Sequence, residues 1–325
     1  MNNTRRQHVV SDLHLRQWAN EDGQVWALDL NTSKLFCTNT KNICVRRDYH
    51  EFEADIELPY SIEEVLAEEI EGPAAKPMLG LADGLLDPLT PEDIDNLCVY
   101  FGYLASRTPF THQKMNKLAI KLHQKNALET LDDPVKLRKF RVEWKKKYPN
   151  KDFPTIQKLN EAVTGDSITW KVMNNDHNLS MMMVVGNLMG KEFWKRKWTL
   201  IQAPKNRQFI CTDNPLVTIS GMSSKGIRTE TIIPIGPQAC LLLEKGFNFN
   251  GITIKTANPK VVREINKRLS LHADRNLISA SERLLNRMKK VRQSNKKFLK
   301  ILKEATPGDA PFRQAPFENL SDLLG

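Results

Sequence analysis

The spacing of hydrophobic and polar positions changes twice along the chain. Near the N-terminus, two β-prone runs over 24–30 and 34–38 are separated by the short polar segment 31–33, which predicts a β-hairpin. From residue 198 onward short β-prone runs return, with Gly, Pro and Asn in their connections, which favours antiparallel pairing over βαβ units. These runs cover 198–202, 208–211, 216–219, 231–235 and 239–243.

Between these two β-prone parts the hydrophobic spacing is typical of helices. Ser61 and Glu64 have the spacing of a capping box, and apolar residues follow at helical intervals as far as Ile70. We expect Gly72-Pro73 to end this helix. A second helix is predicted from Thr90-Pro91, a cap followed by a first-turn proline, to the residues before Pro109.

Arg107 continues the apolar face of the second helix, since it lies three residues after Leu104 and ten after Leu97. A buried arginine without a partner would cost several kcal/mol. We therefore predict an ion pair with Asp213 as the first choice and Glu71 as the second, or a bound ligand. Glu71, expected near the negative end of the first helix, also calls for a cationic partner, either an arginine or a metal ion.

These elements predict an α+β protein with a single domain over 1–325. An antiparallel sheet in the C-terminal half should pack against a largely helical middle, with helices around 94–104 and 181–188 covering one face of the sheet. The lysine-rich segment 132–160, interrupted by three prolines, is a possible surface insertion. We expect a loosely ordered tail over 306–325.

The distribution of charge along the chain bears on the class of binding partner. The chain of 325 residues has a formal net charge of +10, concentrated over 114–151 and 260–303, while 48–95 is acidic. Basic faces of this kind favour nucleic acid as a partner, although they are also typical of solvated helix surfaces. The candidate contact residues are Lys114, Lys117, Lys121, Lys125, Arg287, Lys290, Lys297 and Lys300.

Other features mainly exclude functions. No apolar run approaches the roughly 20 residues that span a bilayer, the basic N-terminus is not followed by an apolar segment, and the five cysteines are scattered. We therefore expect a cytoplasmic protein without a membrane partner; oligomeric state is left open. Walker, dinucleotide-binding, HExxH and GxSxG motifs are absent. Lone histidines are interpreted as surface or helix residues: His14, His50, His112, His123, His177 and His272.

Asp213 and Asn214 interrupt two β-prone runs immediately before Pro215. Polar side chains at the end of a buried strand are held rigidly, and this is a common way to build a site. The same residues are also ordinary turn formers. Both interpretations remain open at this point.

Several short motifs occur in an order that resembles the domain of unknown function 4238 family, which is uncharacterised and mainly bacterial. The resemblance covers nearly the whole chain. Val9 and Ser11 depart from the family's tyrosine and proline. The motifs are Gln7-His8-Val9-Val10-Ser11 with Leu15-Arg16-Gln17-Trp18, then Ile70-Glu71, Arg107-Thr108-Pro109, Thr212-Asp213-Asn214-Pro215 and Ile233-Pro234-Ile235-Gly236-Pro237, with Asn266 in a later helix.

The resemblance and the residue pattern together lead to a functional hypothesis. We expect a hydrolase of nuclease type in which five polar side chains converge: His8, Glu71, Arg107, Asp213 and Asn214. Asp213 and Glu71 would hold Mg²⁺ or Mn²⁺ or act as base, His8 would transfer a proton, and Arg107 would stabilise phosphate charge. The alternative is a non-catalytic module that binds nucleic acid or protein through its basic helices, with the polar residues forming a structural network.

Overall fold

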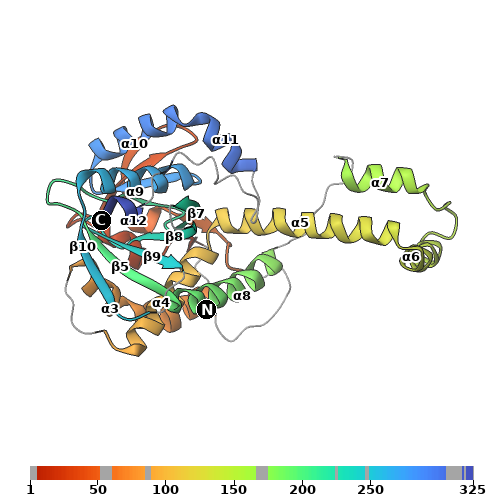
Figure 1. Ribbon diagram of the computed structural model, residues 1–325, viewed down its shortest axis with the longest axis horizontal. Coiled ribbons are helices and arrows are strands. Elements are labelled where there is room, and N and C mark those ends of the chain that lie inside the picture. The colour runs from red at the N-terminus through yellow and green to blue at the C-terminus, as the bar shows by residue number, and fades with distance from the viewer. Residues whose placement is uncertain are drawn as a thin grey trace. The chain divides into compact units, whose positions relative to one another are not determined.

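The computed structural model describes residues 6–51, 61–84, 89–165, 175–223, 226–245, 249–304, 317 and 320–324 (Figure 1). The chain divides into two compact units, each of which is described by itself. The larger contains Met1–His112 and Asn175–Gly325, and the smaller contains Gln113–Asn174. None of the described helices combines the length and the apolar character that a bilayer crossing requires.

The larger unit contains a five-stranded sheet in the order β10-β5-β9-β8-β7. Four of its strands pair antiparallel, as predicted, and β10 joins the edge parallel to β5. The strand over 208–211 was predicted for this sheet and is not part of it. The strands are β5 (Arg196–Gln202), β7 (Val217–Ser223), β8 (Gly226–Pro234), β9 (Ala239–Lys245) and β10 (Ile252–Thr256).

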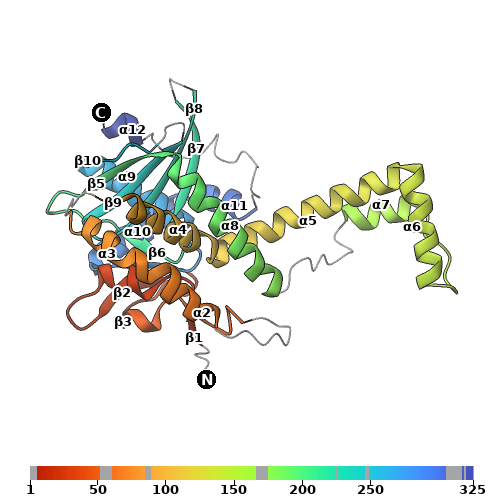
Figure 2. The same cartoon turned by 90° about the horizontal axis from the view of Figure 1, so that it is seen from below.

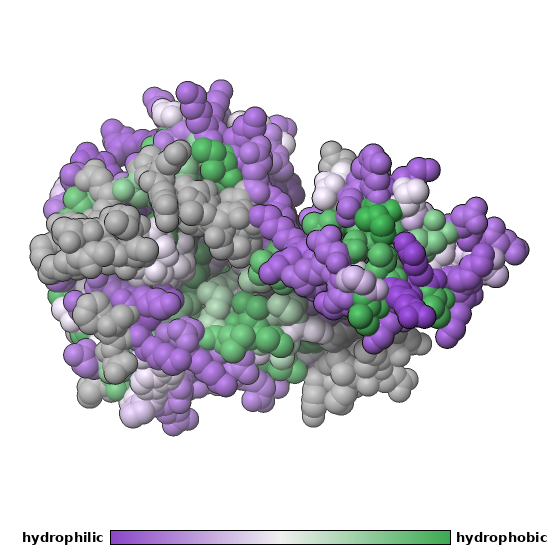
Figure 3. Space-filling view, turned by 45° about the vertical axis from the view of Figure 1, so that its right-hand side comes forward, coloured by the Kyte–Doolittle hydropathy of each residue, from purple (hydrophilic) through white to green (hydrophobic). Residues whose placement is uncertain are grey.

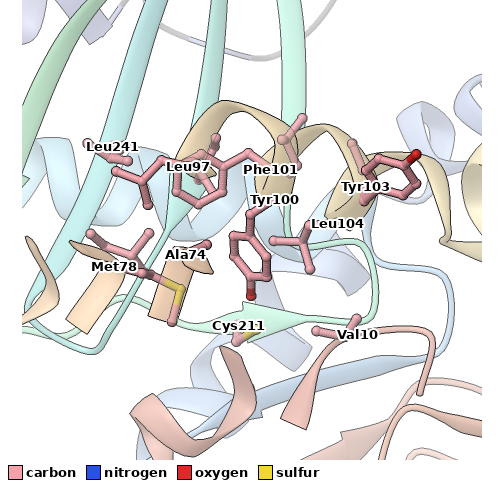
Figure 4. Packing of buried hydrophobic residues seen from close by; sticks show 14 of the residues in the cluster. Val10, Ala74, Met78, Leu97, Tyr100, Phe101, Tyr103, Leu104, Cys211 and Leu241 are labelled. Atoms are coloured by element: carbon pink, nitrogen blue, oxygen red, sulfur yellow. The ribbon is translucent and has the colours of Figure 1, made fainter. Parts of the chain in front are cut away.

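Both faces of this sheet are buried. Leu241 and Leu243 of β9 belong to the core that includes α3 (Gly72–Ala82) and α4 (Pro91–Ser106), whereas Cys240 and Leu242 face α9 (Pro259–His272) and α10 (Glu282–Ser294). Figure 4 shows the α4 side of this core, with Phe101 packed near Leu241. Because successive side chains of β9 point to opposite faces of the sheet, the strand packs against helices on both faces.

Helix α8 (Asn175–Trp194) was predicted to cover the sheet, and its main partner is instead α4. Three glycines bring the two backbones close together: Gly102 of α4 with Gly186 and Gly190 of α8. Apolar residues of α8 that do not face α4 reach the surface, including Val184 and Leu188. Hydrophobic areas are also visible among hydrophilic ones in Figure 3.

The predicted N-terminal hairpin is confirmed as β2 (Gln24–Asp29) paired antiparallel with β3 (Leu35–Asn39). It belongs to a second sheet in the order β3-β2-β11-β6, in which β11 (Asn276–Ser279) and β6 (Cys211–Thr212) come from the C-terminal half. Residues of β2, β6 and β11 share a core with α3 and α4, so these helices contact both sheets (Figure 2).

The helix that begins after Ser61 does not end at Gly72-Pro73, which corrects the prediction. The capping box of Ser61 and Glu64 is present at α2 (Ile62–Val65). The chain then passes through a π-helical turn, η3 (Leu66–Glu71), directly into α3. Proline is tolerated here because it stands in the first turn of α3, where its missing N–H is least costly.

The remaining elements of the larger unit are short or terminal. Strands β1 (Arg6–His8) and β4 (Val45–Arg47) pair antiparallel. The predicted loose tail falls mostly outside the described residues, but α12 (Leu320–Leu324) packs with Leu320 fully buried. The other helices are α1 (Asp12–Leu15), η1 (Arg16–Trp18), η2 (Thr40–Asn42) and α11 (Lys296–Glu304).

The smaller unit is helical and includes the segment 132–160. It contains most of α5 (Pro109–Asp132), followed by α6 (Pro134–Lys147) and α7 (Ile156–Thr164). Phe140 and Trp144 of α6 make edge contacts with Phe153. These contacts between partly buried aromatic rings join α6 to the segment that follows it.

Candidate functional site

Glu71 and Arg107 meet in the larger unit, as the second choice of the sequence prediction proposed. Arg107 follows the last residue of α4, is 2% exposed, and donates from Nη1 to Oε1 of Glu71 at 2.8 Å. The hydroxyl of Ser11 donates to Oε2 of Glu71, also at 2.8 Å. Both carboxylate oxygens are therefore engaged, and Glu71 lies in the π-helical turn η3, a conformation frequent at functional sites.

The guanidinium of Arg107 retains unused hydrogen-bonding capacity. Its Nε and Nη2 are buried and have no hydrogen-bond partner among the residues that the structure describes. Burial lowers the pKa of Arg107, but the neighbouring charge of Glu71 outweighs it and raises the pKa overall. The buried Tyr100 hydroxyl, which points towards Cys211 in Figure 4, also lacks a hydrogen bond within the described part of the chain. Arg107 is thus a permanent buried cation with two nitrogens available to an acceptor.

A carboxylate–histidine pair adjoins this arginine. His50 Nδ1 lies 2.7 Å from Oε2 of Glu63, and the backbone N–H of His50 donates to the side-chain oxygen of Gln7. Burial by itself raises the pKa of Glu63, but the hydrogen bond from His50 and the charge of Arg107 lower it overall. A carboxylate at Nδ1 favours the tautomer with its proton there, so Nε2 carries the lone pair. That Nε2 is buried and has no partner in the described ranges.

Two further histidines are buried nearby. Burial, with the charge of Arg107, lowers the pKa of His14 to about 3. Burial likewise lowers the pKa of His112 to about 4, and its Nδ1 lies 2.7 Å from the hydroxyl of Tyr49. We call this group the Arg107 cluster: Ser11, His14, Tyr49, His50, Glu63, Glu71, Tyr100, Arg107 and His112.

Asp213 has a different environment and is not paired with Arg107, so the first choice of partner was wrong. Its two oxygens accept hydrogen bonds from the backbone N–H groups of 274–276 at 2.7–3.0 Å. Burial raises the pKa of Asp213 to about 6, against the lowering effect of these donors. Asn214 donates to the carbonyl of His272 at the end of α9. Both side chains therefore hold the connection between α9 and β11.

His8 contacts the cluster only through its backbone. Its N–H lies 3.3 Å from Oε1 of Glu63, while its ring Nε2 lies 3.4 Å from the carbonyl of Thr40. The five residues proposed from the sequence therefore do not form one site. Glu71 and Arg107 form an ion pair, Asp213 and Asn214 hold the connection between α9 and β11, and the ring of His8 lies outside the cluster.

The proposed divalent cation does not fit Asp213 and Glu71. Each carboxylate already accepts hydrogen bonds on both oxygens, from backbone N–H groups or from Arg107 and Ser11. Across the described parts of the chain, no group of three or more His, Cys, Asp or Glu side chains is placed to hold a metal ion.

Sequence reasoning missed most of the cluster. His14, His50 and His112 were interpreted as surface or helix residues. His14 and His112 do lie in helices, α1 and α5, but none of the three is at the surface, since all are buried. The carboxylate that orients His50 is that of Glu63, in the helix after Ser61, and no sequence pattern links the two residues. For His14 alone a signal existed, because it follows the motif containing Ser11 by three residues.

The candidate nucleic-acid contacts lie in both units. Lys114, Lys117, Lys121 and Lys125 belong to α5 in the smaller unit. In the larger unit, the four others are exposed on α10 and α11: Arg287, Lys290, Lys297 and Lys300.

The family model described as "Protein of unknown function (DUF4238)" matches residues 6–283, and the chain belongs to this family. All residues of the Arg107 cluster fall within the matched segment. No curated protein and no solved structure matches the chain.

Proposed function

We propose that this protein is a hydrolase of nuclease type and that it cleaves a phosphodiester at the Arg107 cluster. The observation that carries the proposal is the unused capacity of Arg107. Its Nε and Nη2 form two adjacent donors of a planar fork, which matches the geometry of two phosphate oxygens. A phosphodiester anion bound to these two donors would supply the acceptors that the described residues do not provide.

Glu71 and Ser11 hold the fork in position. The hydrogen bond from Nη1 to Glu71 fixes the guanidinium plane, and Ser11 fixes the carboxylate from its other oxygen. In a buried site, a guanidinium fixed in this way stabilises the additional charge that phosphate oxygens gain in the transition state.

His50 is the proposed general base. With Nδ1 held by Glu63, the lone pair of Nε2 accepts a proton from water as the water oxygen forms a bond to phosphorus. The P–O bond to the leaving oxygen breaks, and that oxygen takes a proton from solvent. The proton-transfer role first predicted for His8 therefore moves to His50, and Asp213 and Asn214 act as structural supports of the site.

The location proposed for this activity is the cytoplasm. All five cysteines are free thiols, and four of them are buried. Unpaired cysteines are typical of proteins in a reducing compartment.

The test is a cleavage assay with single-stranded and double-stranded DNA and RNA, run with Mg²⁺, with Mn²⁺ and with a chelator. His50→Gln removes the base and should lower kcat by about 10²–10⁴-fold with little change in KM. Arg107→Lys retains a positive charge but loses the fork, and should lower kcat by a similar factor.

Arg268→Lys is the matched control for Arg107→Lys. Arg268 is also buried, but it is paired with both Glu230 and Glu264, outside the cluster. Both arginine variants should be less stable, whereas only Arg107→Lys should lose activity per folded molecule. If the wild-type protein cleaves none of the substrates, or if both arginine variants remain equally active, the proposal is wrong and the cluster is a structural network.

A further inference from the structure

An open basic groove lies in the larger unit, away from the residues of the Arg107 cluster. It has a volume of about 940 Å³ and is bounded by the loop 205–208, by α9 and by α10 as far as Val291. Helices α9 and α10 lie side by side (Figure 1). Asn266 of α9 fixes the loop, because its side chain donates to the carbonyl of Gln208 and accepts from the N–H of Ile210. The loop that forms one wall of the groove is therefore held against α9.

Charge in this groove is strongly unbalanced. Among the described residues that line it, seven side chains are cationic and one, Glu264, is anionic. Glu264 is buried, and its oxygens are already engaged by Arg268 and Lys267. Five of the lining cations make no salt bridge with a carboxylate in the described ranges: Lys205, Arg207, Arg263, Arg283 and Arg287.

Arg207 adds a second, independent observation. Its Nε is shielded from solvent and has no hydrogen-bond acceptor in the part of the chain that the structure describes. A shielded donor on a cation is costly unless an acceptor reaches it. An anion in the groove would provide that acceptor.

The distribution of these cations selects the kind of anion. A single small anion neutralises one or two charges, whereas cations on three separate segments require a ligand with several phosphates. The described lining contains no aromatic residue, so bases cannot stack in the groove. The groove would therefore contact the phosphates of the ligand, and such contacts position a nucleic acid without recognising its sequence.

We propose that this groove binds the phosphate backbone of a nucleic acid independently of sequence. The inference rests on the proposed function, since the bound nucleic acid would be the substrate of the hydrolase. Binding and cleavage are nevertheless separate events, and they are tested separately.

The test compares two triple variants with equal loss of charge. The groove variant replaces three exposed arginines, Arg263→Gln, Arg283→Gln and Arg287→Gln. The control replaces three exposed lysines of the larger unit that neither line the groove nor belong to the candidate nucleic-acid contacts, Lys34→Gln, Lys41→Gln and Lys191→Gln. Affinity for a fluorescent 20-mer of mixed sequence is measured as single strand and duplex between about 50 and 200 mM salt, with chelator present.

The groove variant should bind at least tenfold more weakly, and its log–log salt slope should fall by about two to three, roughly one for each lost phosphate contact. The control should change affinity less than threefold. An equal loss in both variants would show that net charge, rather than the groove, attracts the ligand. Equal competition by inorganic tripolyphosphate at the same phosphate concentration would identify a site for small anions. Either result overturns the inference.

A short substrate keeps this test distinct from that of the proposed function. Bis(p-nitrophenyl) phosphate is too small to span the groove, so the groove variant should hydrolyse it at the wild-type rate. His50→Gln should bind the 20-mer normally and fail to hydrolyse either substrate. Loss of binding without loss of this hydrolysis supports the groove, whereas binding without any hydrolysis contradicts only the proposed catalytic site.

Discussion

Two buried arginines of the larger unit show how pairing distinguishes a structural residue from a candidate site residue. Arg268 contacts Glu230 at 2.7 Å and Glu264 at 3.4 Å, so two carboxylates surround it. Arg107 is similarly buried but, among the residues that the structure describes, forms an ion pair with one carboxylate, that of Glu71. Burial of a charge is tolerated when its hydrogen-bonding groups are satisfied. The unsatisfied hydrogen-bond donors of Arg107 are therefore the feature that favours a bound ligand at this residue.

At the same scale, Asp213 is predicted to stabilise the fold rather than to react. Asp213→Ala removes the acceptors of three backbone N–H groups at 274–276, one of them in a buried and two in part-buried hydrogen bonds. Each orphaned group costs about 1–3 kcal/mol, partly offset because a buried charge is lost as well. The free energy of unfolding should fall by about 2–5 kcal/mol, measured by urea denaturation at pH 7.

Asp274→Ala is the control for this variant, since its partly exposed side chain lies 3.7 Å from Arg46, a distance at which an ion pair contributes little. It should change stability by less than about 1 kcal/mol. A stable Asp213→Ala protein that has lost hydrolytic activity would instead support the catalytic role first assigned to Asp213.

At the scale of elements, local sequence signals predicted helix starts better than helix ends. The capping box predicted at Ser61 is present, and the cap predicted at Thr90 is present as well, in the form of a capping box with Asp93; both depend on residues three positions apart. The inward direction of Arg107 followed from the phase of α4. The end expected at Gly72-Pro73 was wrong because the π-helical turn before it places the proline in a tolerant position. Packing against α4, which spacing does not reveal, keeps this segment helical.

The contact between α4 and α8 gives a second stability prediction. In Gly102→Ala the new methyl carbon would lie 2.1 Å from the backbone oxygen of Gly186. Alanine raises helix propensity by about 1 kcal/mol, but a backbone clash of this size forces the helices apart and breaks their packing. We expect a net loss of about 1–3 kcal/mol or more, measured as a lower Tm.

Val184→Ala, at an exposed position of α8, serves as the comparison. It should leave Tm within about 1 °C, because no packing is lost. An unchanged or higher Tm for Gly102→Ala would mean that the two helices are not in close contact.

At the scale of the whole molecule, the fold class could be predicted but the site could not. Alternation and short connections predict an antiparallel sheet, and helical spacing predicts the helices. Sheet β3-β2-β11-β6, however, joins strands more than 200 residues apart, and no local pattern pairs β2 with β11. The Arg107 cluster is likewise assembled from parts of the chain that are distant in sequence. Ser11, His50, Glu71 and Arg107 come from separate segments. Only tertiary contacts show that His50 is held by a carboxylate.

The buried ionisable groups make stability depend on pH. His14 and His112 have pKa values of about 3 and 4 in the folded protein, below the ordinary value of 6.5. As the pH falls below 6.5, the unfolded chain binds two protons that the folded chain does not, so stability is lost. Asp213, with its pKa raised to about 6, acts in the opposite direction between pH 6 and 4.

Two histidines outweigh one carboxylate, so the free energy of unfolding should fall by several kcal/mol between pH 7 and 4. The loss should begin as the pH falls through 6.5 and continue with a roughly constant slope to about pH 4.5, because Asp213 offsets about one of the two protons that the unfolded histidines bind. Urea denaturation at pH 7, 6, 5 and 4 measures this profile. His14→Gln should flatten it, because one of the two neutral buried histidines is gone, whereas His123→Gln, at an exposed position of α5, should leave its shape unchanged. Stability that rises steadily from pH 7 to pH 5 would show that the histidines are not held neutral by burial.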